Sequence, residues 1–119
     1  MSVECEVEVK VDAGRLQSKV ENNDAFWIFA ANEWHRLISP WTPFRTGNLM
    51  RNVTITPKTI KYNAPYAWDV YHAEHVQFRK VIHPLATAKW DEAAKPSQES
   101  KLNSALQKVI DNGLLGLND

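Results

Sequence analysis

The 119-residue chain has few of the residues on which specialised small folds depend. Its one cysteine, Cys5, excludes an intrachain disulfide and a cysteine-based zinc cluster, and such usage fits a reducing compartment. Four glycines leave little scope for a phosphate-cradling loop, and no Walker or Rossmann fingerprint occurs. No apolar run approaches the roughly 20 residues of a membrane span, and the first residues lack the regions of a signal peptide.

The composition that remains is that of a globular domain. Hydrophobic residues make up 44% and charged residues 24%, which excludes wholesale disorder. The length predicts a single domain over residues 1–119. Fourteen basic and fourteen acidic residues cancel, so nucleic-acid binding cannot rest on overall charge. We therefore expect a soluble domain made in the cytoplasm.

The charges are distributed unevenly along the chain. Residues 1–33 hold seven acids against three bases, whereas residues 34–68 hold five bases and no acid. Such an acid-free segment can present a positive face to an acidic partner or to a phosphate backbone. The simpler alternative is that these bases pair with the acidic N-terminal segment inside the fold.

Alternating apolar and polar residues predict strands. Between Val3 and Val11 the alternation extends over nine residues, which indicates a strand with one face in water. Two short strands joined around Pro57 and one candidate strand are expected over residues 48–55, 58–63 and 76–82. A helix over 48–52 is the alternative for the first of these.

Helical spacing of apolar residues predicts a long helix over 14–38. Asp12 is the candidate N-cap residue, and Pro40 ends the helix because the residue before proline avoids the helical region. The sequence at 21–24 is poor in helix formers, so we expect a bend or fraying there.

Two further helices are expected, a short one over 65–71 and a longer one over 98–115, and helix is expected to return from Leu85 onward. Pro96 either kinks a helix or begins one. Each apolar stripe must be buried against another element. The predicted fold class is therefore α+β, a small, mostly antiparallel sheet packed against a long N-terminal helix and a C-terminal helix.

Candidate chemistry is sparse. His72, His75 and His83 have the side chains of zinc or iron ligands, and the His-x-x-His spacing fits part of a metal site. No second metal-ligand pair accompanies them, which favours surface or interfacial histidines in a loop that follows the short helix. A small metal-dependent enzyme or a nucleic-acid-binding module, using these histidines and the basic segment 34–68, is the alternative function. Cys5 is expected as a buried hydrophobe, not a nucleophile.

The proline-flanked loop that follows the long helix contains the candidate interface residues Trp41, Phe44 and Arg45. A binding platform for single-stranded nucleic acid requires aromatic rings beside basic side chains, and it needs several such rings to be exposed. No catalytic constellation is complete in this chain, so we expect no enzyme activity, no cofactor and no resident metal.

The stretch from Pro43 to Arg51 is the most informative motif. Proline stiffens its beginning, Gly47 provides the backbone freedom of a tight turn, and Leu49 anchors the next element. The pattern consists of Pro43, Thr46, Gly47, Asn48, Leu49 and Arg51. A second pattern follows and begins with Tyr66 and Ala67, with Val70, Tyr71 and His72 after them.

Together the two patterns resemble the minor capsid and neck, or tail-completion, proteins of long-tailed bacteriophages. The valine-rich N-terminal segment is similar to the subgroup of minor capsid proteins from phages of Gram-positive hosts. The resemblance implies an α+β domain without catalysis, whose motif residues form a structural turn. It also implies a homo-oligomeric ring in the virion, assembled in the host bacterial cytoplasm, which docks to other neck or tail proteins. The charge pattern leaves two uses for the basic segment in such a ring, contact with the acidic strand of the next subunit or non-specific contact with passing DNA.

Overall fold

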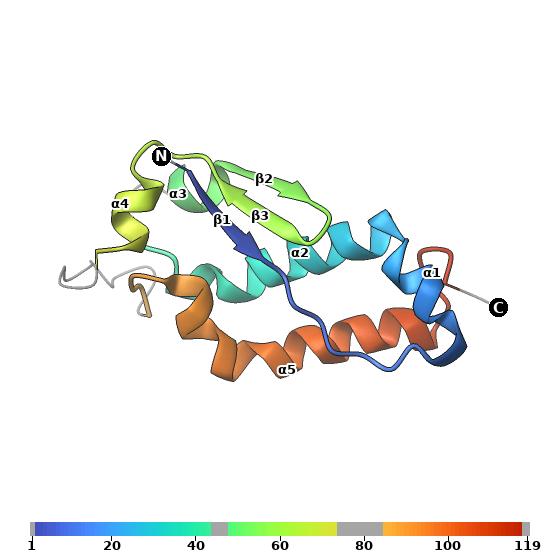
Figure 1. Cartoon of the computed structure of the whole chain (residues 1–119). Helices are drawn as coiled ribbons and strands as arrows, with labels where there is room; N and C mark the ends of the chain where they lie inside the picture. The colour runs from blue at the N-terminus through green and yellow to red at the C-terminus, as the bar shows by residue number, and fades with distance from the viewer. Residues whose placement is uncertain (1, 44–47, 74–84, 118–119) are drawn as a thin grey trace.

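The computed structural model describes residues 2–43, 48–73 and 85–117 (Figure 1). In chain order the elements are β1 (Val3–Glu6), η1 (Gly14–Leu16), α1 (Gln17–Glu21), α2 (Asp24–Ile38), η2 (Ser39–Trp41), α3 (Asn48–Arg51), β2 (Val53–Thr56), β3 (Thr59–Tyr62), α4 (Ala67–Tyr71) and α5 (Trp90–Asp111). The strands form one antiparallel sheet in the order β1-β3-β2, and α2 lies between this sheet and α5 (Figure 1). The predicted α+β class is confirmed. The candidate strand 76–82 lies outside the described residues.

The strand register separates an apolar face from a polar one. Cys5 of β1 and Ile55 of β2 flank Ile60 of β3, and this face is buried against the helices. On the opposite face Glu4 lies across from Lys61, and both side chains are exposed. The sheet therefore has one dry and one wet face, as the alternation predicts.

The first strand is shorter than the alternation suggests. The prediction of one strand from Val3 to Val11 is wrong beyond Glu6, where β1 ends. Immediately afterwards the Val7 amide still donates to the Lys58 carbonyl at 2.8 Å, and the chain then leaves the sheet.

Residues that follow β1 run beside α5 and are fastened to it by side-chain amides. The Lys10 amide donates to Asn103 Oδ1 at 2.9 Å, and the Asp12 amide donates to Gln107 Oε1 at 2.8 Å. Gln107 Nε2 donates in return to the Asp12 carbonyl at 2.8 Å. Val9 packs against the core from this segment. The alternation continues because the helix replaces a neighbouring strand as the apolar surface.

The long predicted helix is divided at residues 21–24. Asn23 caps α2, since its side chain accepts the Phe26 amide at 2.9 Å and so begins a new helix. Asp12 accepts from the Gly14 amide at 3.1 Å, but the cap position of the first 3₁₀ turn is Ala13, one residue later than predicted. As expected, α2 ends before Pro40.

The C-terminal helix, α5, differs from the expected bounds 98–115 at both ends, since it ends at Asp111, and the helix expected from Leu85 onward is present from Trp90. α5 starts at Trp90 and passes through Pro96, which removes one helical hydrogen bond. Figure 1 shows its first turns at an angle to the remainder, so the kink interpretation of Pro96 is confirmed. The side chain of Trp90 is completely buried among the core residues, against the sheet.

The segment between α2 and α4 also differs in detail from the prediction. Residues 48–51 form α3, so a strand beginning at 48 is wrong and the alternative helix is right. The hairpin of β2 and β3 is confirmed, with Lys58 at a positive φ of 68° in its two-residue turn. The short helix expected over 65–71 is present as α4.

Candidate assembly surfaces

The two sequence patterns meet at one end of the molecule. Asn48 in α3 donates from Nδ2 to the Tyr66 hydroxyl, just before α4, at 3.1 Å. Leu49 is 4% exposed and Ala67 is fully buried, so each anchors its short helix in the core. Arg51 is exposed at the end of α3. These contacts join the described parts of both patterns, and their role as a structural turn stays a prediction.

The remaining motif and interface residues are only partly described. Pro43 and Trp41 are half-buried, and the Trp41 carbonyl accepts the Thr87 amide at 3.0 Å. Outside the described residues lie Phe44, Arg45, Thr46 and Gly47. The interface role of Trp41 therefore stays a prediction, as do those of Phe44 and Arg45.

Of the three histidines in the metal-site hypothesis, the structure describes His72 alone. His75 and His83 lie outside the described residues, whereas His72 stacks on Trp68 with ring centroids 4.2 Å apart. His72 Nδ1 also lies 2.8 Å from the Trp68 carbonyl oxygen. Across residues 2–43, 48–73 and 85–117, no three histidine, cysteine or acidic side chains are grouped to hold a metal ion.

A buried histidine that the sequence analysis overlooked connects two motif elements. His35 in α2 places Nε2 2.8 Å from the Met50 carbonyl oxygen in α3. Burial lowers the pKa of His35, and the hydrogen bond to Met50 opposes that effect. His35 is therefore a structural contact that fixes the position of α3 on α2.

A group of aromatic and polar side chains surrounds Asp91 at the start of α5. We name it the Asp91 junction, and it consists of Cys5, Tyr62, Tyr71, Trp90 and Asp91. The Tyr71 hydroxyl donates to Asp91 Oδ1 at 2.6 Å. Asp91 lies in the first turn of α5, where the helix dipole stabilises negative charge. Burial, and then Asp91, raises the pKa values of both Cys5 and Tyr71. The junction ties β1 and α4 to the start of α5.

The aromatic part of the Asp91 junction is closely packed. Trp90 meets Tyr62 and Tyr71 edge to face, with ring centroids 5.1 Å and 4.9 Å away. The Tyr62 hydroxyl and the Trp90 indole N–H are both buried, and neither has a hydrogen-bond partner among the described residues. Burial is also the main reason for the raised pKa of Tyr62. Packing, more than hydrogen bonding, stabilises this side of α5.

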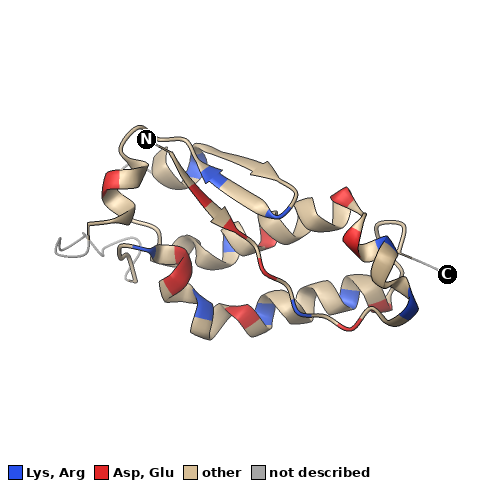
Figure 2. Cartoon of the chain, in the orientation of Figure 1, with Lys and Arg blue, Asp and Glu red and all other residues tan. Residues whose placement is uncertain are grey.

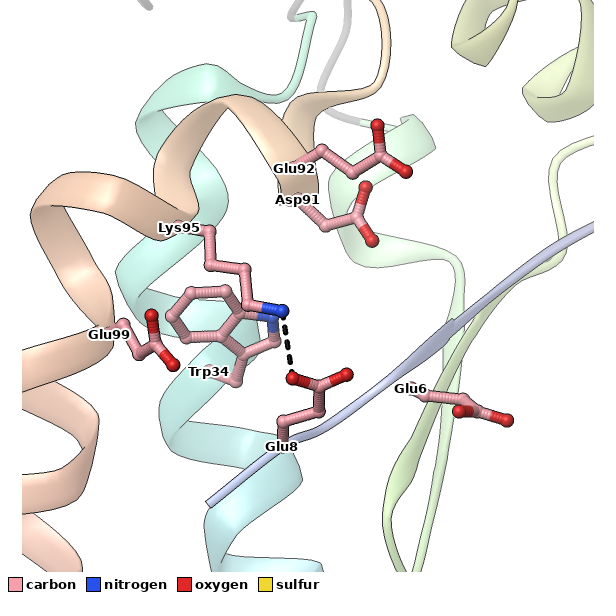
Figure 3. Close-up of a pocket in the computed structure, with 7 residues that line it drawn as sticks. All are labelled: Glu6, Glu8, Trp34, Asp91, Glu92, Lys95 and Glu99. Carbon is pink, nitrogen blue, oxygen red and sulfur yellow. Dashed lines mark hydrogen bonds and ion pairs between the residues drawn. The ribbon is translucent and has the colours of Figure 1, made fainter. Parts of the chain in front are cut away.

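On another face of α5 lies a pocket of about 180 Å³ whose walls are mostly carboxylates (Figure 3). We call this the acidic pocket, and its residues are Glu6, Glu8, Trp34, Asp91, Glu92, Lys95 and Glu99. They come from β1, the segment after it, α2 and α5. Five carboxylates therefore surround one ammonium group.

Among the described residues, one ion pair lies in the acidic pocket, and it joins Lys95 Nζ to Glu8 Oε2 at 2.8 Å (Figure 3). The hydrogen bond and charge of Lys95 lower the pKa of Glu8, and Glu8 in turn raises the pKa of Lys95. Both side chains are largely exposed, so the pair contributes little to stability. One lysine leaves the negative charge of the other carboxylates uncompensated.

The bases of the acid-free segment are spread over other elements (Figure 2). Arg36 pairs with Glu33 at 2.8 Å, which confirms for this residue the simpler alternative of pairing with N-terminal acids. Lys58, at the hairpin turn, lies 4.4 Å from the centre of the Trp27 ring. Lys61 is exposed on the wet face of the sheet.

The sequence analysis missed the acidic pocket because its residues come from opposite ends of the chain. One local signal was present, since Asp91, Lys95 and Glu99 recur at intervals of four and must share one face of a helix. That spacing predicts a charged helix face, but it cannot indicate that Glu6 and Glu8 lie across from it.

Comparison with known proteins gives one match. A family model described as "Minor capsid protein" matches residues 7–110, a range that includes both sequence patterns and almost all of the acidic pocket. No curated protein and no solved structure matches the chain. None of the described helices combines the length and the apolar character that crossing a membrane requires.

Proposed function

The chain belongs to the minor capsid protein family, and from that premise we propose that it forms a homo-oligomeric ring at the head–tail junction of a phage. Membership makes the protein a structural component of the virion and implies a non-enzymatic role. It also agrees with the resemblance that Asn48, Leu49, Tyr66 and Ala67 suggest. We assign assembly of the ring to the cytoplasm of the host bacterium, and the valine-rich start of the chain favours a Gram-positive host.

One observation carries the ring proposal, namely that negative charge is concentrated at one place on the chain while exposed bases lie elsewhere. The acidic pocket holds the negative charge, and the described bases of the acid-free segment 34–68 lie on α2, on α3 and on the hairpin (Figure 2). In a head-to-tail ring, one patch of each subunit meets a different patch of the next. Complementary charges favour such a contact and fix its register.

Docking to other neck or tail proteins requires a second surface. Tyr66 and Trp68 are each 42% exposed at α4, next to the joint between the two sequence patterns. Large aromatic side chains at a surface are enriched in protein interfaces. We assign this aromatic end to the neighbouring protein. A lumen lined by parts of the basic segment would also allow weak contact with passing DNA phosphates, without sequence readout.

Deletion of the gene from the phage tests the proposal directly. We expect filled heads and separate tails in electron micrographs, because the two parts cannot be joined without the ring. Expression of the chain in trans restores joined particles and serves as the control. Normal, infectious particles without the protein would contradict the proposed role.

A further inference from the structure

We propose that the acidic pocket receives a lysine or arginine side chain from the acid-free segment of a second copy of this chain. The inference rests on the proposed ring and assigns residues to its interface. One side of the contact is the acidic pocket, and the other is the basic surface that includes Arg51, Lys58 and Lys61.

The first reason is uncompensated charge. Lys95 is engaged by Glu8, whereas Glu6, Glu92 and Glu99 form no ion pair with any described residue. A cation entering the pocket would face several carboxylates at once, so its attraction is larger than that of a single exposed pair. The described acidic side chains are not grouped to coordinate a metal ion. A long organic cation, whose charge interacts at greater distances, fits this spacing better.

The second reason is Trp34, which lines the pocket beside the Lys95–Glu8 pair (Figure 3). Its side chain is only 6% exposed, yet its indole N–H donates to no residue in the described part of the chain. The N–H itself is not fully buried, so it is in contact with the water of the pocket and can donate to an entering group. A peptide carbonyl next to the entering basic residue would accept this hydrogen bond, and the indole ring favours a cation.

The third reason concerns the source of the cation. A volume of about 180 Å³ accommodates the end of one long side chain and a few water molecules, not a folded element. The acid-free segment 34–68 of the same chain offers such side chains, although Glu33 pairs with Arg36 and Glu4 lies across from Lys61 on the wet face of the sheet. Lys61 is exposed and forms no ion pair with a described residue, and Lys58 has only an exposed ring contact. A second copy therefore provides the complementary surface.

The first experiment measures binding to the pocket alone. Arginine amide, which carries both a guanidinium and a carbonyl, is titrated into the wild-type protein while NMR follows the Trp34 indole N–H, assigned with Trp34→Phe. We expect a saturable shift that Glu6→Gln/Glu92→Gln weakens at least tenfold. Glu21→Gln/Asp69→Asn, with the same charge change outside the pocket, should bind as the wild type does. No shift at Trp34, or equal affinity in both double variants, would overturn the pocket assignment.

The second experiment identifies the occupant. Sedimentation over a range of protein and salt concentrations should show wild-type self-association that weakens with salt. Both Glu6→Gln/Glu92→Gln and Lys58→Gln/Lys61→Gln should abolish it, and Glu21→Gln/Asp69→Asn, which changes the same charge away from both surfaces, should not. If arginine amide binds but wild type and pocket variant have the same mass, a second copy is not the occupant. Such a result leaves the ring open to the gene-deletion test, so the two proposals fail separately.

Discussion

The first turns of α5 have two faces that are built differently. On one face Trp90 and Asp91 close the Asp91 junction by packing against Tyr62 and Tyr71. On the other face Glu92 and Lys95 line an open pocket with an excess of negative charge. The comparison teaches that a packed surface and an open, charged surface are separated on this helix by direction, not by position along the chain. Substitutions on the two faces should therefore affect different measurements.

We call the face with the Asp91 junction the closed face and the face with the acidic pocket the open face. The largest loss of stability is expected when the closed face loses the side chain of Trp90. Trp90→Ala removes a fully buried indole and should lower the free energy of unfolding by about 3–5 kcal/mol. Urea denaturation followed by circular dichroism measures this loss. Trp68→Ala is the matched control, because Trp68 is 42% exposed and its removal should cost far less. Equal losses would show that the junction is not the core of this end.

The closed face should also make the protein sensitive to alkali. Cys5 and Tyr62 have pKa values raised above their ordinary 9.0 and 10.0 by burial. Above those values the unfolded chain loses protons that the folded chain keeps, so stability falls as pH rises. Each group contributes up to about 1.4 kcal/mol per pH unit. Urea midpoints between pH 8 and about 11 test this, and a flat profile would contradict it.

Asp91 belongs to both faces of α5, so its substitution should lower both the stability of the protein and its binding of arginine amide. Asp91→Ala removes the acceptor of the Tyr71 hydroxyl and should cost about 1–3 kcal/mol in unfolding free energy. Because one carboxylate also leaves the acidic pocket, arginine amide should bind more weakly. Urea denaturation and the NMR titration must both change. A change in one measurement alone would assign Asp91 to a single face.

A smaller effect of opposite sign is expected at the unpartnered hydroxyl of Tyr62. Tyr62→Phe keeps the buried ring and removes a polar group that has no described hydrogen-bond partner. The folded state then no longer bears the cost of desolvating this group, so stability should rise by about 1 kcal/mol. Thermal unfolding measures the change. A clear loss of stability would indicate that the hydroxyl is satisfied in solution.

The smallest effect on stability should come from the open face. Glu6→Gln changes an exposed side chain without an ion pair to a described residue, so the free energy of unfolding should stay within about 0.5 kcal/mol. Binding of arginine amide should nevertheless weaken. Thermal unfolding and titration of the same sample should therefore show unchanged stability together with weaker binding. A destabilised variant would refute the separation of the two faces.

Local sequence patterns predicted whether a segment is a helix or a strand better than they predicted where it ends or which element packs against it. Alternation located β1, but the same pattern continues through Val9 and Val11 because α5 also provides an apolar surface. Periodicity reports which side chains are buried and does not report what buries them. The motif could be found from the sequence because its residues are adjacent. The acidic pocket could not, because Glu8 meets Lys95 only after the chain has folded.

The contact between Gln107 and Asp12 has a consequence for protein synthesis. The ribosome makes Asp12 early, but the side-chain amide that binds both its N–H and its carbonyl appears only with residue 107. In the same way, the Lys10 amide can form its hydrogen bond only after Asn103 has been synthesised. The hairpin can form on a nascent chain, whereas the segment after β1 stays undocked until translation has passed Gln107. Because that segment carries Glu8, a complete acidic pocket would appear only on subunits synthesised beyond this point, and unfinished chains would be kept from assembly.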